Sequence, residues 1–391
     1  MNQKLINSAF LDSYKQGASP TDLRQSIINT FFPFFENKKF LEDHAWIWLV
    51  QDFIEFEQIS NNAIAIRILN NSLRIHNSAN KVNQAGSLKV AFGWLRKIHK
   101  TASVSSSWIL DLFNKRFDSD NIDLEKHVYD LFDDLGIIIE GICKPYLYEI
   151  YHQLQVEAGK EVTIGQVEEH TLGALVNKLD KIADLLELTR PGRMGIKLNR
   201  WRNIGKHYSW EIKEKSIVCA YGLANKKEII LNLNGLQNLI SQILANTTSL
   251  ILAHRIYYVD NISLAAQLKL LPRDVEPNSK GKTFSIKTML SAMGFEILGL
   301  DVKDTSISLV IKNALLISDD ERRMELFQAA IMASHVKQNC SVSLDYFDKN
   351  GKPNYRVSYD VLAIQKLMKK DYSAISLVDY ISSANYQDLK N

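Results

Sequence analysis

An arginine and a histidine, Arg202 and His207, lie five residues apart in the segment RWRNIGKHYSW, residues 200–210. A histidine titrates near neutral pH and can take the proton from a 2′-hydroxyl group. An arginine can hold a phosphate and stabilise the extra negative charge of a pentacoordinate phosphorus. The pair could therefore cleave RNA without a metal ion, although arginine and histidine at this spacing also occur by chance.

The spacing of the pair sets a geometric condition on this chemistry. Five residues of a regular α-helix rotate by about 500°, which leaves the two side chains about 140° apart. They would meet only if the helix ended near Gly205, or if a site were shared between two subunits. A glycine between them makes the first arrangement possible, because glycine accepts backbone conformations that other residues avoid.

The segment belongs to a stretch with no acidic residue between Glu187 and Glu211. A cation at a helix C-terminus gains only about 0.3–1 kcal/mol, which accounts for one or two basic residues but not for all of them. We therefore expect an anion site here, with phosphate as the anion. The basic residues of the stretch are Arg190, Arg193, Lys197, Arg200, Arg202, Lys206 and His207.

The chain as a whole has 391 residues, enough for two or three domains, and its net charge of +3 gives no general affinity for nucleic acid. Three widely spaced cysteines argue against zinc ribbons, iron–sulfur clusters and a disulfide framework. There is no phosphate loop, dinucleotide fingerprint, HExxH or GxSxG motif, and no histidine pair has metal-ligand spacing. We therefore expect neither a metal nor another cofactor. No signal peptide or membrane-spanning segment is evident, so we expect a cytoplasmic protein with no membrane partner.

Hydrophobic periodicity predicts a mainly α-helical protein with three consecutive domains. Residues 1–118 are expected to form an N-terminal helical domain that ends in a linker rich in Asp, Asn and Ser. Residues 119–265 are expected to form a four-helix bundle with a small β-hairpin insert. Residues 275–391 are expected to form a small C-terminal α+β domain.

The middle domain supplies the elements that would position Arg202 and His207. Pro145 should kink or break its longest helix. The expected elements are, in order, a helix over 124–159, an amphipathic helix over 168–188, a short helix over 196–210, a hairpin from the runs 216–222 and 228–233, and a helix over 234–258.

In the C-terminal domain, two strands are expected within 295–314, followed by a well-capped helix over 318–336. A turn of the Asn-Gly kind at 348–354 is expected to join strands at 341–347 and 355–364. No internal repeat is evident.

The sequence RNIGKHYSW, which follows two amphipathic helices, resembles the signature of the HEPN superfamily, R-x4-6-H with a polar residue after the arginine. Arg202, Asn203 and His207 match these three positions. The order of four helices and the strand pair behind the motif are also similar to HEPN proteins. The resemblance covers residues 123–260, roughly a third of the chain, and leaves the flanking regions unexplained.

HEPN domains are commonly metal-independent endoribonucleases of toxin, abortive-infection and CRISPR-associated systems, and they usually dimerise so that two motifs share a cleft. The resemblance therefore implies an endoribonuclease in which Arg202 and His207 are catalytic and Asn203 orients them. It implies a homodimer that cleaves RNA in phage defence or a toxin system, with an antitoxin or defence-system protein as a further partner.

Two points stay open within this resemblance. Some toxin members carry a tyrosine two places after the histidine, whereas Tyr208 follows His207 directly, which does not fit that subtype. Some HEPN proteins do not cut RNA, so the alternative is a non-catalytic protein that binds RNA or a nucleotide as a sensor or scaffold.

The expected RNA-binding residues also have plainer interpretations. Basic side chains near the motif can contact phosphate or lie on a solvated face. Tyr208 can contact the scissile region or pack at a dimer seam. The complete set of candidates is Arg193, Lys197, Arg200, Lys206 and Tyr208.

Three further residues have a predicted environment. Trp201 and Trp210 flank the motif and could stack on a base, but core packing is favoured. Glu140 lies in a long apolar helical run, where a buried acid needs a partner. It is expected either to pair with Arg202 or another arginine of the motif, or to face solvent.

Overall fold

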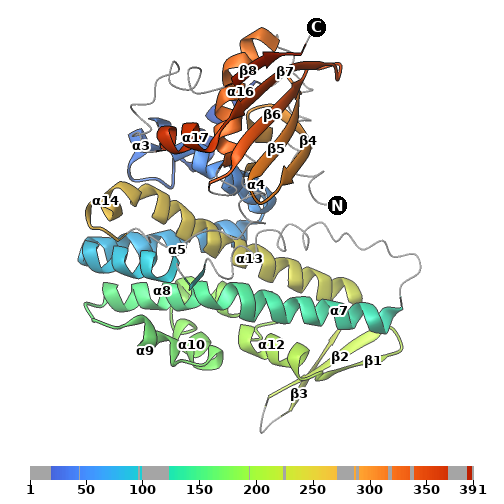
Figure 1. Cartoon of the computed structure of the whole chain (residues 1–391). Coiled ribbons are helices and arrows are strands. Elements are labelled where there is room, and N and C mark those ends of the chain that lie inside the picture. Colours follow the sequence, from blue (N-terminus) through green and yellow to red (C-terminus); the bar gives the residue numbers. More distant parts are fainter. Residues whose placement is uncertain are drawn as a thin grey trace. The chain divides into compact units, whose positions relative to one another are not determined.

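The computed structural model describes residues 19–43, 45–95, 97–98, 123–192, 194–222, 226–270, 286–287, 290–315, 319–334, 339–368 and 385–389. This part of the chain is mainly helical and contains two small sheets (Figure 1). It forms two compact units. Unit 1 takes Met1–Thr30, Trp46–Gln51 and Pro277–Asn391, and unit 2 takes Phe31–Ala45 and Asp52–Glu276. None of the described helices is both long and apolar enough to cross a membrane.

The described residues between 19 and 98 are mainly helical, as predicted, whereas residues 1–18 and 99–122, including the predicted linker, lie outside the described residues. Residues 84–95 are also helical. The other elements are α2 (Pro20–Phe31), α3 (Lys38–Asp43), η1 (Ala45–Leu49), α4 (Val50–Ile59) and α5 (Ala63–Val82).

The core of unit 2 joins this N-terminal region to the middle of the chain. Helix α5 packs against both α8 (Lys144–Glu157) and α13 (Leu233–Asp260). One continuous apolar cluster contains Ile68 and Trp94 together with Leu147 and Leu250. The boundary expected at residue 118 therefore does not separate two compact units, because the helices on its two sides bury their apolar faces against each other.

The expected helix over 124–159 is present as one rod, visible in Figure 1 as α7 followed by α8. Helix α7 (Leu124–Ile137) passes into α8 through a π-helical turn, η2 (Ile138–Cys143). Pro145 is the second residue of α8 and has no N–H to donate. The backbone N–H of Lys144 instead reaches back to the carbonyl of Ile139, five residues earlier. The predicted kink or break is thus replaced by one wide turn that keeps the rod continuous.

The amphipathic helix predicted over 168–188 was wrong as a single element. After α9 (Ile164–Glu168), this part of the chain instead forms three short elements. They are α10 (Leu172–Leu179), a 3-10 turn η3 (Ala183–Leu185) and α11 (Leu186–Thr189). Ile182 has an extended backbone, with φ −101° and ψ 114°. The apolar spacing continues across this break, but the chain turns at Asp180, whose carboxylate accepts hydrogen bonds from Thr189 and Arg190.

The predicted hairpin is part of a three-stranded antiparallel sheet in the order β1-β2-β3. Strands β2 (Ser216–Tyr221) and β3 (Lys227–Leu231) form the expected hairpin, and β1 (Trp210–Lys213) adds a strand that was not predicted. This strand has four residues and follows the motif helix α12 (Leu198–Lys206) after three residues. Helix α13 and the short helix α14 (Ile262–Gln267) complete unit 2.

Unit 1 contains a five-stranded sheet in the order β4-β5-β6-β7-β8. All neighbouring pairs are antiparallel except β5 with β6, which are parallel and are joined by the crossover helix α16. The predicted strands and helix are confirmed, except that residues 361–364 belong to helix α17 rather than to a strand. The elements are β4 (Phe295–Val302), β5 (Ser306–Asn313), α16 (Asp319–Ser334), β6 (Ser341–Phe347), β7 (Pro353–Tyr359), α17 (Val361–Met368) and β8 (Asn385–Asp388).

Candidate functional site

The motif helix α12 packs against α7 through its buried residues, among them Trp201, Ile204 and Gly205. A Cβ atom on Gly205 would lie 2.8 Å from the carbonyl oxygen of Phe132 in α7, which is closer than real Cβ contacts. Gly205 is therefore required for the close approach of two helices. Gly205 was predicted to allow an unusual backbone conformation that ends the helix. This prediction was wrong, because Gly205 lies inside α12.

Helix α12 ends one residue later in a Schellman turn. His207 is the C-cap, and Tyr208 has a left-handed backbone with φ 51°. The N–H of Tyr208 donates to the carbonyl of Gly205 at 3.2 Å, and the N–H of Ser209 donates to that of Ile204 at 3.0 Å. The helix thus ends next to Gly205, as expected, and it leaves the side chain of His207 exposed.

The turn does not bring His207 back towards Arg202. The N–H of His207 still donates to the carbonyl of Asn203 at 3.0 Å, so His207 follows the helical path and stays about 140° away from Arg202. Among the described residues, no hydrogen bond or ion pair joins the two side chains. Asn203 is half-buried and lies one turn before His207 on α12. Within one chain, the structure therefore does not bring the predicted catalytic pair together.

Arg202 is held instead by a glutamate from the neighbouring rod. Its Nη2 lies 2.8 Å from Oε1 of Glu140 in η2, while Nζ of Lys206 lies 3.0 Å from Oε2 of the same carboxylate. Burial raises the pKa of Glu140, but the hydrogen bond from Lys206 and the charges of Arg202 and Lys206 outweigh it and keep the pKa below its ordinary value. Of the two environments expected for Glu140, the structure shows the pair with Arg202, and the Glu140 side chain remains 30% exposed.

Two other basic residues of the stretch are also paired. Asp180 accepts two hydrogen bonds from Arg190, at 2.6 and 2.7 Å, and its carboxylate lies 2.8 Å from Nζ of Lys197. The hydrogen bond from Arg190 lowers the pKa of Asp180 most, and the bonds from Lys197 and Thr189 lower it further against the opposing effect of burial. The basic stretch contains no acidic residue, but two carboxylates from other elements, those of Glu140 and Asp180, pair with its basic side chains.

The remaining predicted RNA-binding residues have different surroundings. Arg200 is half-buried, and its backbone N–H donates to the carbonyl of Lys197. Arg193 lies outside the described residues. Trp201 is fully buried and the ring of Trp210 stacks on Phe132, which confirms that both tryptophans pack in the core.

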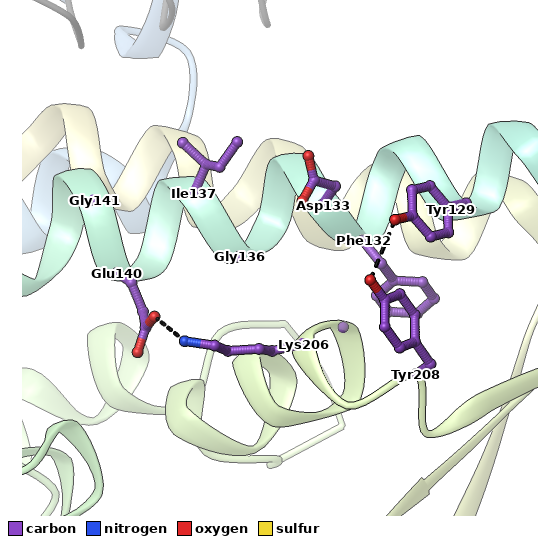
Figure 2. Close-up of a pocket in the computed structure, with 10 residues that line it drawn as sticks. Tyr129, Phe132, Asp133, Gly136, Ile137, Glu140, Gly141, Lys206 and Tyr208 are labelled. Carbon is purple, nitrogen blue, oxygen red and sulfur yellow. Dashed lines mark hydrogen bonds and ion pairs between the residues drawn. The ribbon is translucent and has the colours of Figure 1, made fainter.

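A hollow of about 360 Å³ lies between α7 and the end of α12. We call it the tyrosine hollow, because Figure 2 shows the rings of Tyr129 and Tyr208 facing each other across one end of it. The two rings stack at 5.6 Å with an angle of 11°, and both remain exposed, by 46% and 61%. Its lining residues are Tyr129, Phe132, Asp133, Gly136, Ile137, Glu140, Gly141, Gly205, Lys206 and Tyr208.

The tyrosine hollow contains two predicted RNA-binding residues, Lys206 and Tyr208, but neither Arg202 nor His207. Tyr129 was not predicted as a site residue. Its only sequence signal is that an aromatic side chain occupies a polar position of the helix over 124–159. Asp180 was missed as well, since a carboxylate after an amphipathic helix has no distinguishing local pattern. The stacked aromatic faces and the amine of Lys206 are the groups that could bind a base and a phosphate.

No protein-family model, curated protein or solved structure matches this chain.

Proposed function

We propose that this protein is a metal-independent endoribonuclease of the HEPN type. The observation that carries the proposal is the arrangement at the end of α12. His207 is exposed and its side chain has no bond to any described residue, while Arg202 is held in place by Glu140 through Nη2 alone. A guanidinium has five N–H donors, so Arg202 retains donors for a phosphate.

In the proposed reaction, the imidazole of His207 takes the proton from a ribose 2′-hydroxyl. The 2′ oxygen attacks the adjacent phosphorus, and the bond from phosphorus to the 5′ oxygen breaks. The leaving 5′ oxygen takes a proton from water, and the protonated His207 then returns its proton to the hydroxide formed, which gives a 2′,3′-cyclic phosphate and a 5′-hydroxyl. Arg202 stabilises the charge of the pentacoordinate phosphorus, and Asn203 orients the pair.

The proposal requires two copies of the chain, because the pair points apart within one α12. In a homodimer the arginine of one subunit can face the histidine of the other across a shared cleft. We further propose that the protein works in the cytoplasm in phage defence or a toxin system, where RNA cleavage would be controlled by an antitoxin or defence-system protein.

The direct test is cleavage of a labelled RNA by the full chain in excess EDTA. Arg202→Ala and His207→Ala are each expected to lower the cleavage rate by about 10²–10⁴-fold, in the range of single acid–base and charge-stabilising groups. Arg67→Ala and His170→Ala, outside the motif helix, are the matched controls and should cleave like the wild type. Cleavage that persists in both motif variants would overturn the proposal.

A mixture of the two inactive variants tests whether the site is shared. In a mixed dimer of Arg202→Ala and His207→Ala subunits, one cleft would pair the intact arginine of one chain with the intact histidine of the other. Partial recovery of cleavage is therefore expected on mixing. No recovery, together with mixed dimers detected by native mass spectrometry, would mean that each chain works with its own pair.

The second candidate function is RNA or nucleotide binding without cleavage, and the tyrosine hollow favours it. Its stacked rings and Lys206 can bind a base and a phosphate whether or not His207 is catalytic. Tyr208→Ala should then weaken RNA binding in a gel-shift assay by up to about 3 kcal/mol, as for loss of one stacked base. Binding without any cleavage by the wild type would favour this function over the first.

A further inference from the structure

A second set of functional groups lies in the interior of unit 2, formed by His76 of α5, Glu149 of α8 and His254 of α13. We call these residues the buried triad. Their side chains are at most 1% exposed. One donor atom from each of the three lies within 4.8 Å of the others. Nε2 of His76 is 2.8 Å from Oε1 of Glu149, and Nδ1 of His254 is 3.0 Å from Oε2.

The position of His76 leaves one nitrogen free for a ligand. Its Nδ1 lies 2.7 Å from the backbone carbonyl of Ser72, which can only accept a hydrogen bond, so Nδ1 carries the proton. In the neutral ring Nε2 then presents a lone pair to the carboxylate of Glu149, and two acceptors face each other at 2.8 Å. Either a second proton on His76 or a metal cation must lie between them. A histidine whose other N–H is fixed by a backbone carbonyl is the usual form of a metal ligand.

The other half of the buried triad distinguishes these two possibilities. Oε2 of Glu149 and both ring nitrogens of His254 are buried and make no hydrogen bond of good geometry, although Nδ1 of His254 lies 3.0 Å from Oε2. A buried polar atom without a hydrogen-bond partner is unfavourable. A cation bound by all three residues would satisfy the carboxylate, Nε2 of His76 and Nδ1 of His254 at once, and would leave Nε2 of His254 without a partner.

We propose that His76, Glu149 and His254 bind one divalent transition metal ion. Two imidazole nitrogens and one carboxylate form a ligand set that Zn²⁺ and Fe²⁺ accept, and a water molecule would complete a four-coordinate shell around Zn²⁺. Because the triad is closed to solvent, the ion would join α5, α8 and α13 rather than reach RNA. The site is therefore independent of the proposed cleavage, in which no metal takes part.

The test is the metal content of the full chain, purified without a metal-affinity column and measured by mass spectrometry. About one transition metal ion per chain is expected. Glu149→Gln and His254→Gln should lower the affinity by more than the 10–100-fold that is typical of losing an outer partner of a metal ligand. His170→Ala, a histidine outside the triad, should keep the ion. Full metal content in either triad variant would place the ion elsewhere and overturn the proposal.

A second measurement needs no variant and decides the case if the variants fail to fold. Wild-type protein stripped with a strong chelator is refilled with Co²⁺ or Zn²⁺. Visible absorption bands of four- or five-coordinate Co²⁺ and a rise in Tm with Zn²⁺ are expected. A chain that is purified without metal, gives no Co²⁺ bands and shows no change in Tm would overturn the proposal and leave the buried triad as a proton-sharing cluster.

Discussion

Two glutamates on the same helical rod, Glu140 in η2 and Glu149 in α8, each contact two basic side chains in opposite surroundings. The side chain of Glu140 is 30% exposed and pairs with Arg202 and Lys206. The side chain of Glu149 is 1% exposed and faces His76 and His254. Burial raises the pKa of both carboxyls, and in both the basic partners outweigh it, so that each pKa lies below its ordinary value.

The two sites differ in the chemistry of the basic side chains that contact each glutamate. Arginine and lysine keep their protons at any physiological pH, so Glu140 can only hold Arg202 in position. An imidazole in its neutral form presents a lone pair, and burial makes an uncompensated charge next to Glu149 expensive. The same side chain thus holds a cationic partner at the surface, and in the interior it faces groups that the proposed metal ion would join.

The largest expected effect compares the same substitution at both glutamates. Glu149→Gln should lower the free energy of unfolding by about 3–5 kcal/mol, because it breaks a buried charged pair. Glu140→Gln should lower it by at most about 1 kcal/mol, because its pairs are open to solvent. Urea unfolding at pH 7 in EDTA measures both without bound metal. Equal losses in the two variants would mean that burial does not distinguish the sites.

An intermediate effect is expected from the contact that places α12 beside Glu140. Gly205→Ala introduces a Cβ atom 2.8 Å from the Phe132 carbonyl and should lower stability by about 1–3 kcal/mol through overpacking. Gly136→Ala is the matched control on α7, since its Cβ would meet nothing within 4 Å. It should raise stability by up to about 1 kcal/mol, the difference in helix propensity. Thermal unfolding compares the two, and a neutral Gly205→Ala would contradict the close contact.

The smallest effect concerns the pH dependence of the exposed site. The pKa of Glu140 is lower in the folded protein than in the unfolded chain, so its contribution is present above its unfolded pKa. It is lost as pH falls through the folded pKa, when the carboxylate is protonated. The stability difference between wild type and Glu140→Gln, at most about 1 kcal/mol, should therefore be constant at neutral pH and shrink below about pH 4. The midpoints of urea unfolding from pH 7 to pH 3 measure this stability difference. A difference that increases as the pH falls would contradict the prediction.

The sequence predicted most of the fold where apolar spacing and turn residues agree. The rod over 124–159, α12, α13 and the strands β4, β5, β6 and β7 were found from their apolar spacing and turn residues, whereas β8 was not predicted. The break after α10 was missed because the apolar positions continue through Ile182, and the break depends on hydrogen bonds to Asp180. Strand β1 was missed because four residues are too short for a periodic signal.

The site was predictable only where it is local in sequence. The sequence predicted a helix around Arg202, which α12 confirms, and it left Glu140 either paired with an arginine of the motif or facing solvent. The pairing of Asp180 with Lys197 was not predictable, because it joins two elements that only the fold brings together. The buried triad gave no motif, since His76 and Glu149 are separated by 73 residues and lie on different helices. A search for closely spaced metal ligands in the sequence therefore could not find the triad.

The wide turn η2 also limits which insertions and deletions this part of the chain can accept. In a regular α-helix, the nine residues from Glu140 to Glu149 would rotate by about 900°, half a turn beyond two full turns. In the structure, Glu140 meets α12 while Glu149 meets α5 and α13. Deleting or inserting one residue between 138 and 143 would turn α8 by about 100° relative to α7, and the two contacts could not both survive. This short segment should accept changes of side chain far more readily than changes of length.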